Sequence, residues 1–191
     1  MKIFVFVDNY KIDAGYYILP DTALNRVGQP YFLPDFDGEQ MAFPMLAVRI
    51  GRLGKNISEK FSPRYIDAVA PAIVFRDERM LDQFRSKGLP WSPAVSFDGV
   101  VNHANWIPTP DDAVLTPFRW IVEHNGKAVQ TCDSSDLLRS PEQLVSLLSR
   151  SHKLCQGDIV LTGGSEGFAC QYDDEIRGLV DQREVLHFRI K

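Results

Sequence analysis

The feature that most constrains this chain is a series of short apolar segments that are separated by Pro, Gly and Asn turns. Residues Lys2–Val7 are apolar on both faces, as in a buried strand. Met41–Ile50 forms a second such segment, where Pro44 predicts an edge strand or a bulge because proline cannot donate to a ladder. Strands outnumber helices and do not alternate regularly with them. This favours an α+β fold over a doubly wound one.

Helices are predicted at three places. Ser62-Pro63 is typical of an N-cap and first turn, and this helix should end before Pro71. Residues Asp77–Ser86 carry an apolar face and are followed by Gly88, a helix stop. The segment Ser140-Pro141-Glu142-Gln143 matches a capping box.

Hairpins and short strands fill the rest of the chain. Phe118–Glu123 alternates between apolar and polar residues before Asn125-Gly126, which predicts a tight hairpin turn. Ile159–Leu161 should be a strand that enters a glycine-rich turn at Gly163-Gly164, and 174–191 should form two strands.

Length and charge limit the class of protein. A chain of 191 residues without repeats or linkers predicts one domain, residues 1–191. A net charge of -4 argues against nucleic-acid and anionic-membrane partners, which require a basic surface. No apolar segment approaches the ~20 residues of a membrane-spanning helix, and the first residues lack the pattern of a signal peptide. Cys132, Cys155 and Cys170 show no CxxC spacing, so we expect reduced thiols and a cytoplasmic location.

General catalytic motifs are weak. The glycine-rich turn lacks the phosphate-binding patterns, so a tight turn is the simpler interpretation. His103 is the best general-base candidate among the scattered histidines, although a loop histidine is the more frequent case. The acidic run 173–175 predicts a solvated turn rather than a metal site, because neighbouring carboxylates do not converge unless the fold brings in other ligands.

Several segments, spread nearly from end to end and in the right order, match the motifs of one family: Asn9-Tyr10, Pro20–Leu24, Pro34-Asp35-Phe36, Gly54-Lys55-Asn56-Ile57, Arg76-Asp77, Lys87–Trp91, Phe97-Asp98-Gly99 and Gly157–Gly163. The chain resembles the fumarylacetoacetate hydrolase (FAH) family, in its small single-domain bacterial form. The resemblance implies an FAH-type mixed β-roll with layered sheets and a few short helices, and it implies a homodimer. It also implies cleavage or isomerisation of 2-oxo acids such as acylpyruvates and oxaloacetate.

In the family, Mg²⁺ or Mn²⁺ chelates the 2-oxo acid and is held by a Glu-x-Glu pair and an Asp, because hard cations prefer oxygen ligands. Here the Glu-x-Glu positions fall on Phe43 and Met45, and the Asp position falls on Ala72. The position of the family's lysine falls on Val95. These side chains offer no ligand that suits Mg²⁺.

The family's other groups are missing as well. The threonine and proline of its G-T-P motif fall on Gly164 and Ser165, and Lys11–Leu19 lacks the His-Glu pair of the family's lid. A shift of register is the alternative explanation. It would have to use Glu39, the nearest acidic residue before the strand, and would break the match at Gly54-Lys55.

We therefore predict no metal cofactor and no catalytic residue of the family type, with Arg76 left as the ligand-binding residue. The first hypothesis is a non-catalytic member that binds a small molecule or a protein partner. The alternative is a hydrolase or lyase that acts on a 2-oxo acid or related dicarbonyl with an altered site, for which Arg76, Arg79, His103, Ser165 and Glu166 are the polar candidates.

Overall fold

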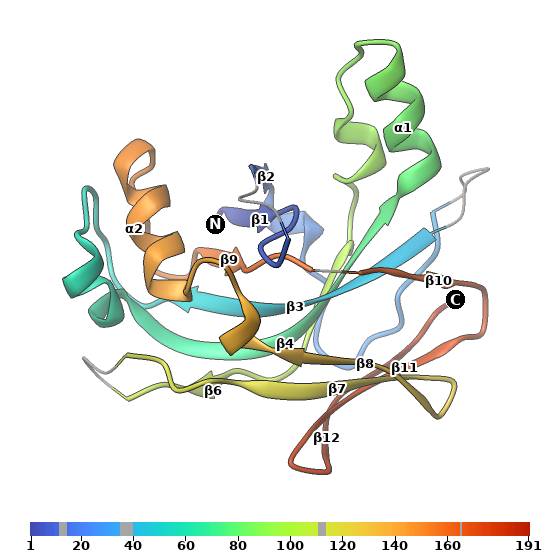
Figure 1. Cartoon of the computed structure of the whole chain (residues 1–191). Helices are drawn as coiled ribbons and strands as arrows, with labels where there is room; N and C mark the ends of the chain where they lie inside the picture. Colours follow the sequence, from blue (N-terminus) through green and yellow to red (C-terminus); the bar gives the residue numbers. More distant parts are fainter. Residues whose placement is uncertain (12–14, 35–39, 111–113, 165) are drawn as a thin grey trace.

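The structure is a computed structural model, and it describes residues 1–11, 15–34, 40–110, 114–164 and 166–191. Two sheets form its two main layers (Figure 1). The larger sheet has the order β2-β1-β9-β3-β4-β5, with β10 beside β3 and β6 beside β4. Its strands are β1 (Ile3–Phe6), β2 (Tyr16–Leu19), β3 (Gln40–Ile50), β4 (Ile66–Asp77), β5 (Val101–His103), β6 (Ile107–Pro108), β9 (Ile159–Leu161) and β10 (Phe168–Cys170).

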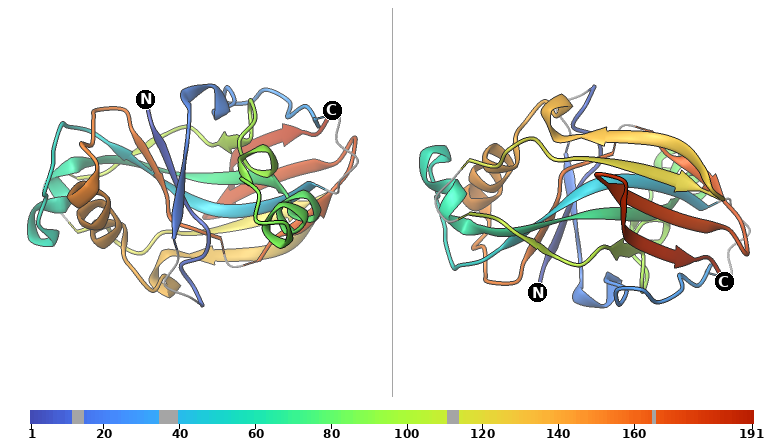
Figure 2. Two further views of the ribbon diagram at one scale, coloured as in Figure 1. Left: turned by 90° about the horizontal axis from the view of Figure 1, so that it is seen from above. Right: turned by 90° about the horizontal axis from the view of Figure 1, so that it is seen from below.

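The smaller sheet is four-stranded and antiparallel, with the order β12-β11-β7-β8. Its strands are β7 (Arg119–His124), β8 (Lys127–Asp133), β11 (Glu175–Val180) and β12 (Arg183–Arg189). Seen from below, it lies in front of β3 and β4 (Figure 2). Helices α1 (Glu78–Ser86) and α2 (Pro141–Ser151) stand on the opposite side of β3 and β4 (Figure 1). This arrangement confirms the α+β prediction.

Short 3-10 helices connect these elements, at Asp21–Ala23, Glu59–Tyr65, Ser92–Ala94 and Ser134–Asp136. One large buried cluster contains residues from both sheets, among them Met45 of β3 and Trp120 of β7. Because this cluster joins the two layers, β3 and β4 form the centre of the molecule. None of the described helices is long and apolar enough to cross a membrane.

Pro44 lies in the central strand β3, so the expectation of an edge strand or bulge at this position was wrong. On one side β3 pairs continuously with β4, and Pro44 is opposite Ile73. On the other side β10 ends its pairing at Ala42 and β9 begins at Ala47. Pro44 therefore falls in the gap between two partner strands, where no ladder donor is required.

The prediction that a helix begins at Ser62-Pro63 was also wrong. These residues belong to the 3-10 helix Glu59–Tyr65, in which the Ser62 hydroxyl donates to the carbonyl of Glu59 instead of capping a helix. The following apolar segment is β4, which passes through Pro71. Pro71 lies between the residues that pair with β6 and those that pair with β5, so a second gap accommodates a proline.

The remaining local predictions are confirmed. Asp77 caps α1 by accepting a hydrogen bond from the Met80 amide at 2.8 Å, and Ser140 and Gln143 form the capping box of α2. Asn125 and Gly126 have φ angles of 51° and 74°, which is the left-handed geometry of a tight hairpin turn.

Candidate functional site

The four positions that carry charge in the resembling family lie together in the core. Met45 on β3 is directly opposite Ala72 on β4, so their side chains share one face of the sheet, and Phe43 lies two residues along on that same face. Val95 follows the 3-10 helix Ser92–Ala94 and belongs to the same buried cluster. The exposed fractions of Phe43, Met45, Ala72 and Val95 are 6%, 1%, 0% and 2%. Apolar side chains therefore occupy this part of the sheet.

The glycine-rich turn after β9 packs directly on these side chains. A Cβ atom on Gly167 would lie 2.6 Å from the Phe43 ring, and one on Gly164 would lie 2.9 Å from the carbonyl oxygen of Pro44. The same Cβ atom on Gly164 would lie 3.5 Å from the methyl carbon of Met45. No threonine would fit at Gly164 in this arrangement, since even a Cβ atom is too close to the backbone.

Arg76 lies near the end of β4, and its guanidinium group stacks on the ring of Phe43. The guanidinium carbon lies 3.6 Å from the centre of the Phe43 ring, a cation–π arrangement. Its Nε atom donates to the carboxylate of Glu78, and the Arg76 side chain is largely buried. The aromatic face and one carboxylate thus compensate the charge of Arg76.

Tyr17 on β2 is a neighbouring polar group that sequence reasoning missed. Burial raises the pKa of its phenol, and the positive charge of Arg76 acts in the opposite direction. Its hydroxyl is buried and has no hydrogen-bond partner among the described residues. Its ring packs edge-on against Trp91. Tyr17 has the alternating pattern of an ordinary strand residue, so no sequence signal marked it.

Of the other polar candidates, Glu166 and His103 have their partners elsewhere. Glu166 is exposed, and its carboxylate forms an ion pair with Lys11 at 3.1 Å. Arg79 is exposed on α1 and also has an interaction partner. Ser165 lies outside the described residues. His103 is buried, its Nδ1 atom lies 2.6 Å from the carbonyl oxygen of Ala104, and its ring packs on Trp106.

His103 should make stability depend on pH. Burial lowers its pKa despite the hydrogen bond to Ala104, so the unfolded chain binds a proton more readily than the folded one. We expect the free energy of unfolding to fall as the pH drops below about 6.5, and less so in a His103→Asn variant. Denaturant unfolding at about pH 7 and about pH 5 measures both. Equal pH dependence in both proteins would contradict the buried, neutral imidazole.

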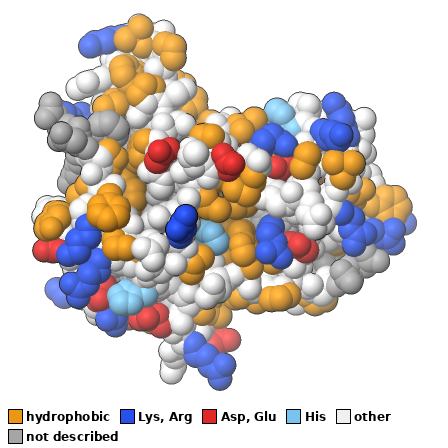
Figure 3. Space-filling view, turned by 180° about the vertical axis from the view of Figure 1, so that it is seen from behind, with side chains coloured by type: hydrophobic (Ala, Val, Ile, Leu, Met, Phe, Trp, Pro, Cys, Tyr) orange, Lys and Arg blue, Asp and Glu red, His pale blue; other side chains and the backbone are white. Residues whose placement is uncertain are grey.

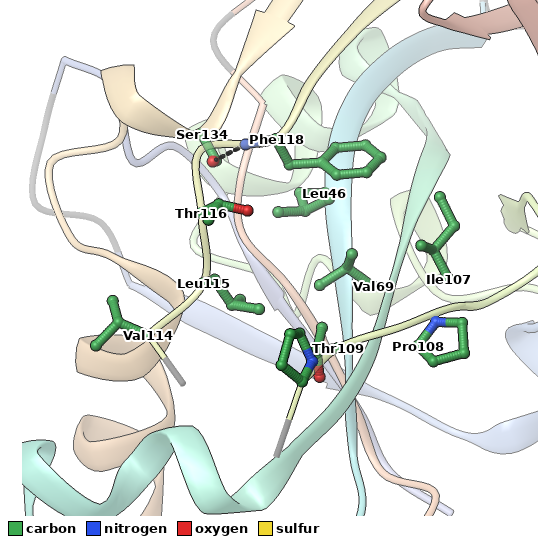
Figure 4. Close-up of a pocket in the computed structure, with 11 residues that line it drawn as sticks. Leu46, Val69, Ile107, Pro108, Thr109, Val114, Leu115, Thr116, Phe118 and Ser134 are labelled. Atoms are coloured by element: carbon green, nitrogen blue, oxygen red, sulfur yellow. Dashed lines mark hydrogen bonds between the residues drawn. The ribbon is translucent and has the colours of Figure 1, made fainter. Parts of the chain in front are cut away.

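An apolar cavity lies on the opposite face of the same strands (Figure 4). Its volume is about 160 Å³. Leu46 and Val69 line it, and the β3–β4 register places both on the face that does not carry Met45 and Ala72. Its other lining residues are Ile107, Pro108, Thr109, Pro110, Val114, Leu115, Thr116, Phe118 and Ser134. Phe43, Met45, Ala72 and Val95 do not line this cavity.

Residues 9–191 match the family described as fumarylacetoacetate (FAA) hydrolase C-terminal. The chain belongs to the fumarylacetoacetate hydrolase family. A crystal structure from Yersinia pestis CO92, assigned to this family, is 28% identical, with a TM-score of 0.91 over 100% of this chain and 92% of that one.

Curated relatives share about a quarter of their residues with this chain. The mitochondrial oxaloacetate tautomerase FAHD1 of Rattus norvegicus is 27% identical over 92% of this chain and 80% of its own length. The oxaloacetate tautomerase YcgM of Escherichia coli K12 is 27% identical over 84% and 74%. The fold is also that of the Pseudomonas aeruginosa fumarylpyruvate hydrolase crystallised with Mn²⁺ and pyruvate, at 20% identity, with a TM-score of 0.91 over 100% of this chain and 89% of that one.

The residues at the motif positions of the fumarylacetoacetate hydrolase family do not fit the Mg²⁺ or Mn²⁺ that the family resemblance implies. These cations take carboxylate, carbonyl or water oxygens as ligands. Phe43, Ala72 and Val95 have no ligand atom, and the thioether of Met45 is a soft donor. The Phe43 ring also occupies the space beside Gly167, as shown by the 2.6 Å that would separate it from a Cβ there. We therefore derive no reaction step through a metal at this position.

Proposed function

We propose that this protein is a member of the fumarylacetoacetate hydrolase family that has lost metal-dependent cleavage of 2-oxo acids and acts as a binding protein. The observation that carries the proposal is the packing of Phe43, Met45, Ala72 and Val95 into one apolar cluster. A group of carboxylates without its cation would be costly to bury, and apolar replacements remove that cost. The pseudoenzyme keeps the fold while the polar site is filled.

The ligand that we propose is a small organic anion, with Arg76 as its anchor. Arg76 and the unpartnered hydroxyl of Tyr17 are close enough for the arginine charge to act on the phenol. A carboxylate could displace Glu78, whose side chain is one-third exposed, and accept hydrogen bonds from both groups. The apolar surroundings would strengthen such a contact.

A turnover assay combined with a binding assay tests this proposal. We expect no tautomerisation of oxaloacetate and no hydrolysis of fumarylpyruvate above background, with or without added Mg²⁺ or Mn²⁺. We expect oxalate or pyruvate to bind, with at least about tenfold weaker binding in Arg76→Ala, because a charge-assisted hydrogen bond contributes ~1.5–3 kcal/mol. Calorimetric titration measures the binding.

Arg85→Ala is the matched control, since Arg85 is exposed on the neighbouring helix α1 and should leave binding unchanged. Metal-dependent turnover by the unaltered protein would overturn the loss of activity. Turnover that needs no metal and disappears in Arg76→Ala would instead support the altered hydrolase or lyase. Binding of oxalate and pyruvate that is equal in Arg76→Ala would contradict the anchor.

Four further expectations belong to this proposal. Residues 1–191 would act as one domain, because the main hydrophobic cluster includes residues of both sheets. The protein would form a homodimer, as the family resemblance implies, which light scattering during gel filtration measures. All three cysteines are free thiols, which supports the expected reducing, cytoplasmic environment. Charges of both signs are spread between apolar patches on the face in Figure 3, which supports the expectation of no nucleic-acid partner.

A further inference from the structure

Three side chains with different metal-binding chemistry meet at the far end of β10. His124, Cys170 and Asp174 each offer one ligand atom, and these atoms all lie within 4.8 Å of one another. Cys170 is buried, while His124 and Asp174 are partly exposed. The cluster therefore has a dry side that carries the thiol and an open side through which an ion can enter.

The topology explains why residues so far apart in the sequence meet. His124 ends β7, where it is paired with Ile176 of β11, and this pairing places it beside the turn that holds Asp174. Cys170 ends β10 and directly precedes the same turn, which spans Gln171–Asp174. The acidic run 173–175 was expected to be a solvated turn, but the fold brings an imidazole and a thiol to its central carboxylate.

Neighbouring hydrogen bonds hold Asp174 in place. The side-chain nitrogen of Asn125 donates to one oxygen of Asp174 at 2.8 Å, and the Gln171 amide donates to the other at 2.8 Å. The Asp174 carbonyl accepts from the Ile190 amide at 2.9 Å. Burial alone would raise the pKa of Asp174, but hydrogen bonds from Asn125, Gln171 and His124 outweigh it and lower that pKa.

A four-coordinate ion requires a shift of these ligand atoms. Around tetrahedral Zn²⁺, bond lengths of about 2.0–2.3 Å place the ligand atoms roughly 3.3–3.6 Å apart. His124 Nε2 and Asp174 Oδ2 are now 2.8 Å apart, at hydrogen-bond distance. An ion that enters between them therefore has to replace one proton and separate these two atoms by about half an ångström.

We propose that His124, Cys170 and Asp174 bind a Zn²⁺ ion, with a solvent molecule as the fourth ligand. On binding, the S–H bond of Cys170 breaks as the S–Zn bond forms, and its proton passes to solvent. The proton of His124 that lies in the hydrogen bond to Asp174 is exchanged through solvent for one on Nδ1, so that the lone pair of Nε2 binds the ion. No electron is transferred, because zinc has no redox chemistry.

Zinc is favoured over the family's cations by the ligand set. A thiolate and an imidazole suit Zn²⁺, whereas Mg²⁺ requires oxygen ligands. The proposed site is also separate from the filled position, because Cys170 is paired with Gln40, three residues and about 10 Å along β3 from Phe43. The proposal does not depend on whether the protein is a pseudoenzyme.

Titration of the purified protein with Co²⁺ as a spectroscopic probe, followed by Zn²⁺ competition, tests this site. We expect one equivalent of Co²⁺ to produce the thiolate charge-transfer absorption and the d–d bands of a tetrahedral complex, and Zn²⁺ to displace it. Cys170→Ser should abolish the charge-transfer band. His124→Gln should weaken binding by at least about tenfold, a loss seen even for residues outside the ligand shell.

The controls are Cys132→Ser and His187→Gln, which alter a buried thiol and an exposed imidazole elsewhere on the smaller sheet and should bind Co²⁺ as the unaltered protein does. Since Cys170→Ser could disturb folding, circular dichroism of each variant is required, and the partly exposed His124 provides a second variant outside the buried core. Absence of the bands in the unaltered protein would overturn the proposal. So would bands that persist in folded His124→Gln and Cys170→Ser.

Discussion

Replacing Met45 with Glu, the residue that the family resemblance places there, is expected to lower the free energy of unfolding by about 3–5 kcal/mol at neutral pH, the cost of an uncompensated buried charge. Met45 is 1% exposed and is surrounded by apolar side chains. A carboxylate at this position is shielded from solvent. Ala72 and Val95 offer it no positive charge. Denaturant unfolding with and without Mg²⁺ measures the loss, and Mg²⁺ should not restore it.

The loss should depend on pH. Burial raises the pKa of the new carboxyl in the folded state above its unfolded value of about 4.3, so the folded state retains the proton longer. The destabilisation is therefore small below about pH 4 and grows as the pH rises above it. Met45→Leu, which conserves volume, is the control and should cost less than about 1.5 kcal/mol. A Met45→Glu protein as stable as Met45→Leu at neutral pH would show that this position is not closed to water.

The second large effect is a coupling between Phe43 and Gly167. Gly167→Ala should cost about 1–3 kcal/mol because its Cβ would enter the Phe43 ring, and Phe43→Ala should cost about 3–5 kcal/mol through the cavity that it leaves. In the double variant the new methyl group occupies space that the ring has vacated. The loss of stability in the double variant should therefore be smaller than the sum of the two single losses by at least about 0.5 kcal/mol. A double-mutant cycle measures this difference.

Gly15→Ala is the matched glycine control, because a Cβ there meets nothing within 4 Å and should change stability little. Additive losses from Phe43→Ala and Gly167→Ala would mean that the ring does not press on the glycine-rich turn. The space beside Phe43 and Gly167 would then not be tightly filled.

Local chemistry made much of the fold predictable from the sequence. Asn125-Gly126 specifies a left-handed turn, and Ser140 with Gln143 specifies a helix start, because each depends on adjacent residues alone. Pro44 and Pro71 misled the local prediction. Their cost depends on which strands pair beside them, and that depends on residues more than a hundred positions away for Pro44.

The same distinction applies to the candidate site. The absence of oxygen ligands at Phe43, Met45, Ala72 and Val95 was visible in the sequence once the motifs were aligned, but their packing against Gly167 required the three-dimensional structure. The meeting of His124 with Cys170 and Asp174 left no sequence signal, because β7 and β10 lie in different sheets. Spacing motifs identify ligands only when they are contributed by one local element.

The most direct test of the central claim is a crystal structure of the protein soaked in Mn²⁺, with the ion located by its anomalous scattering. We expect no manganese between Met45, Ala72 and Val95, because apolar side chains fill this space. A manganese ion bound there by oxygen atoms of this chain would contradict it.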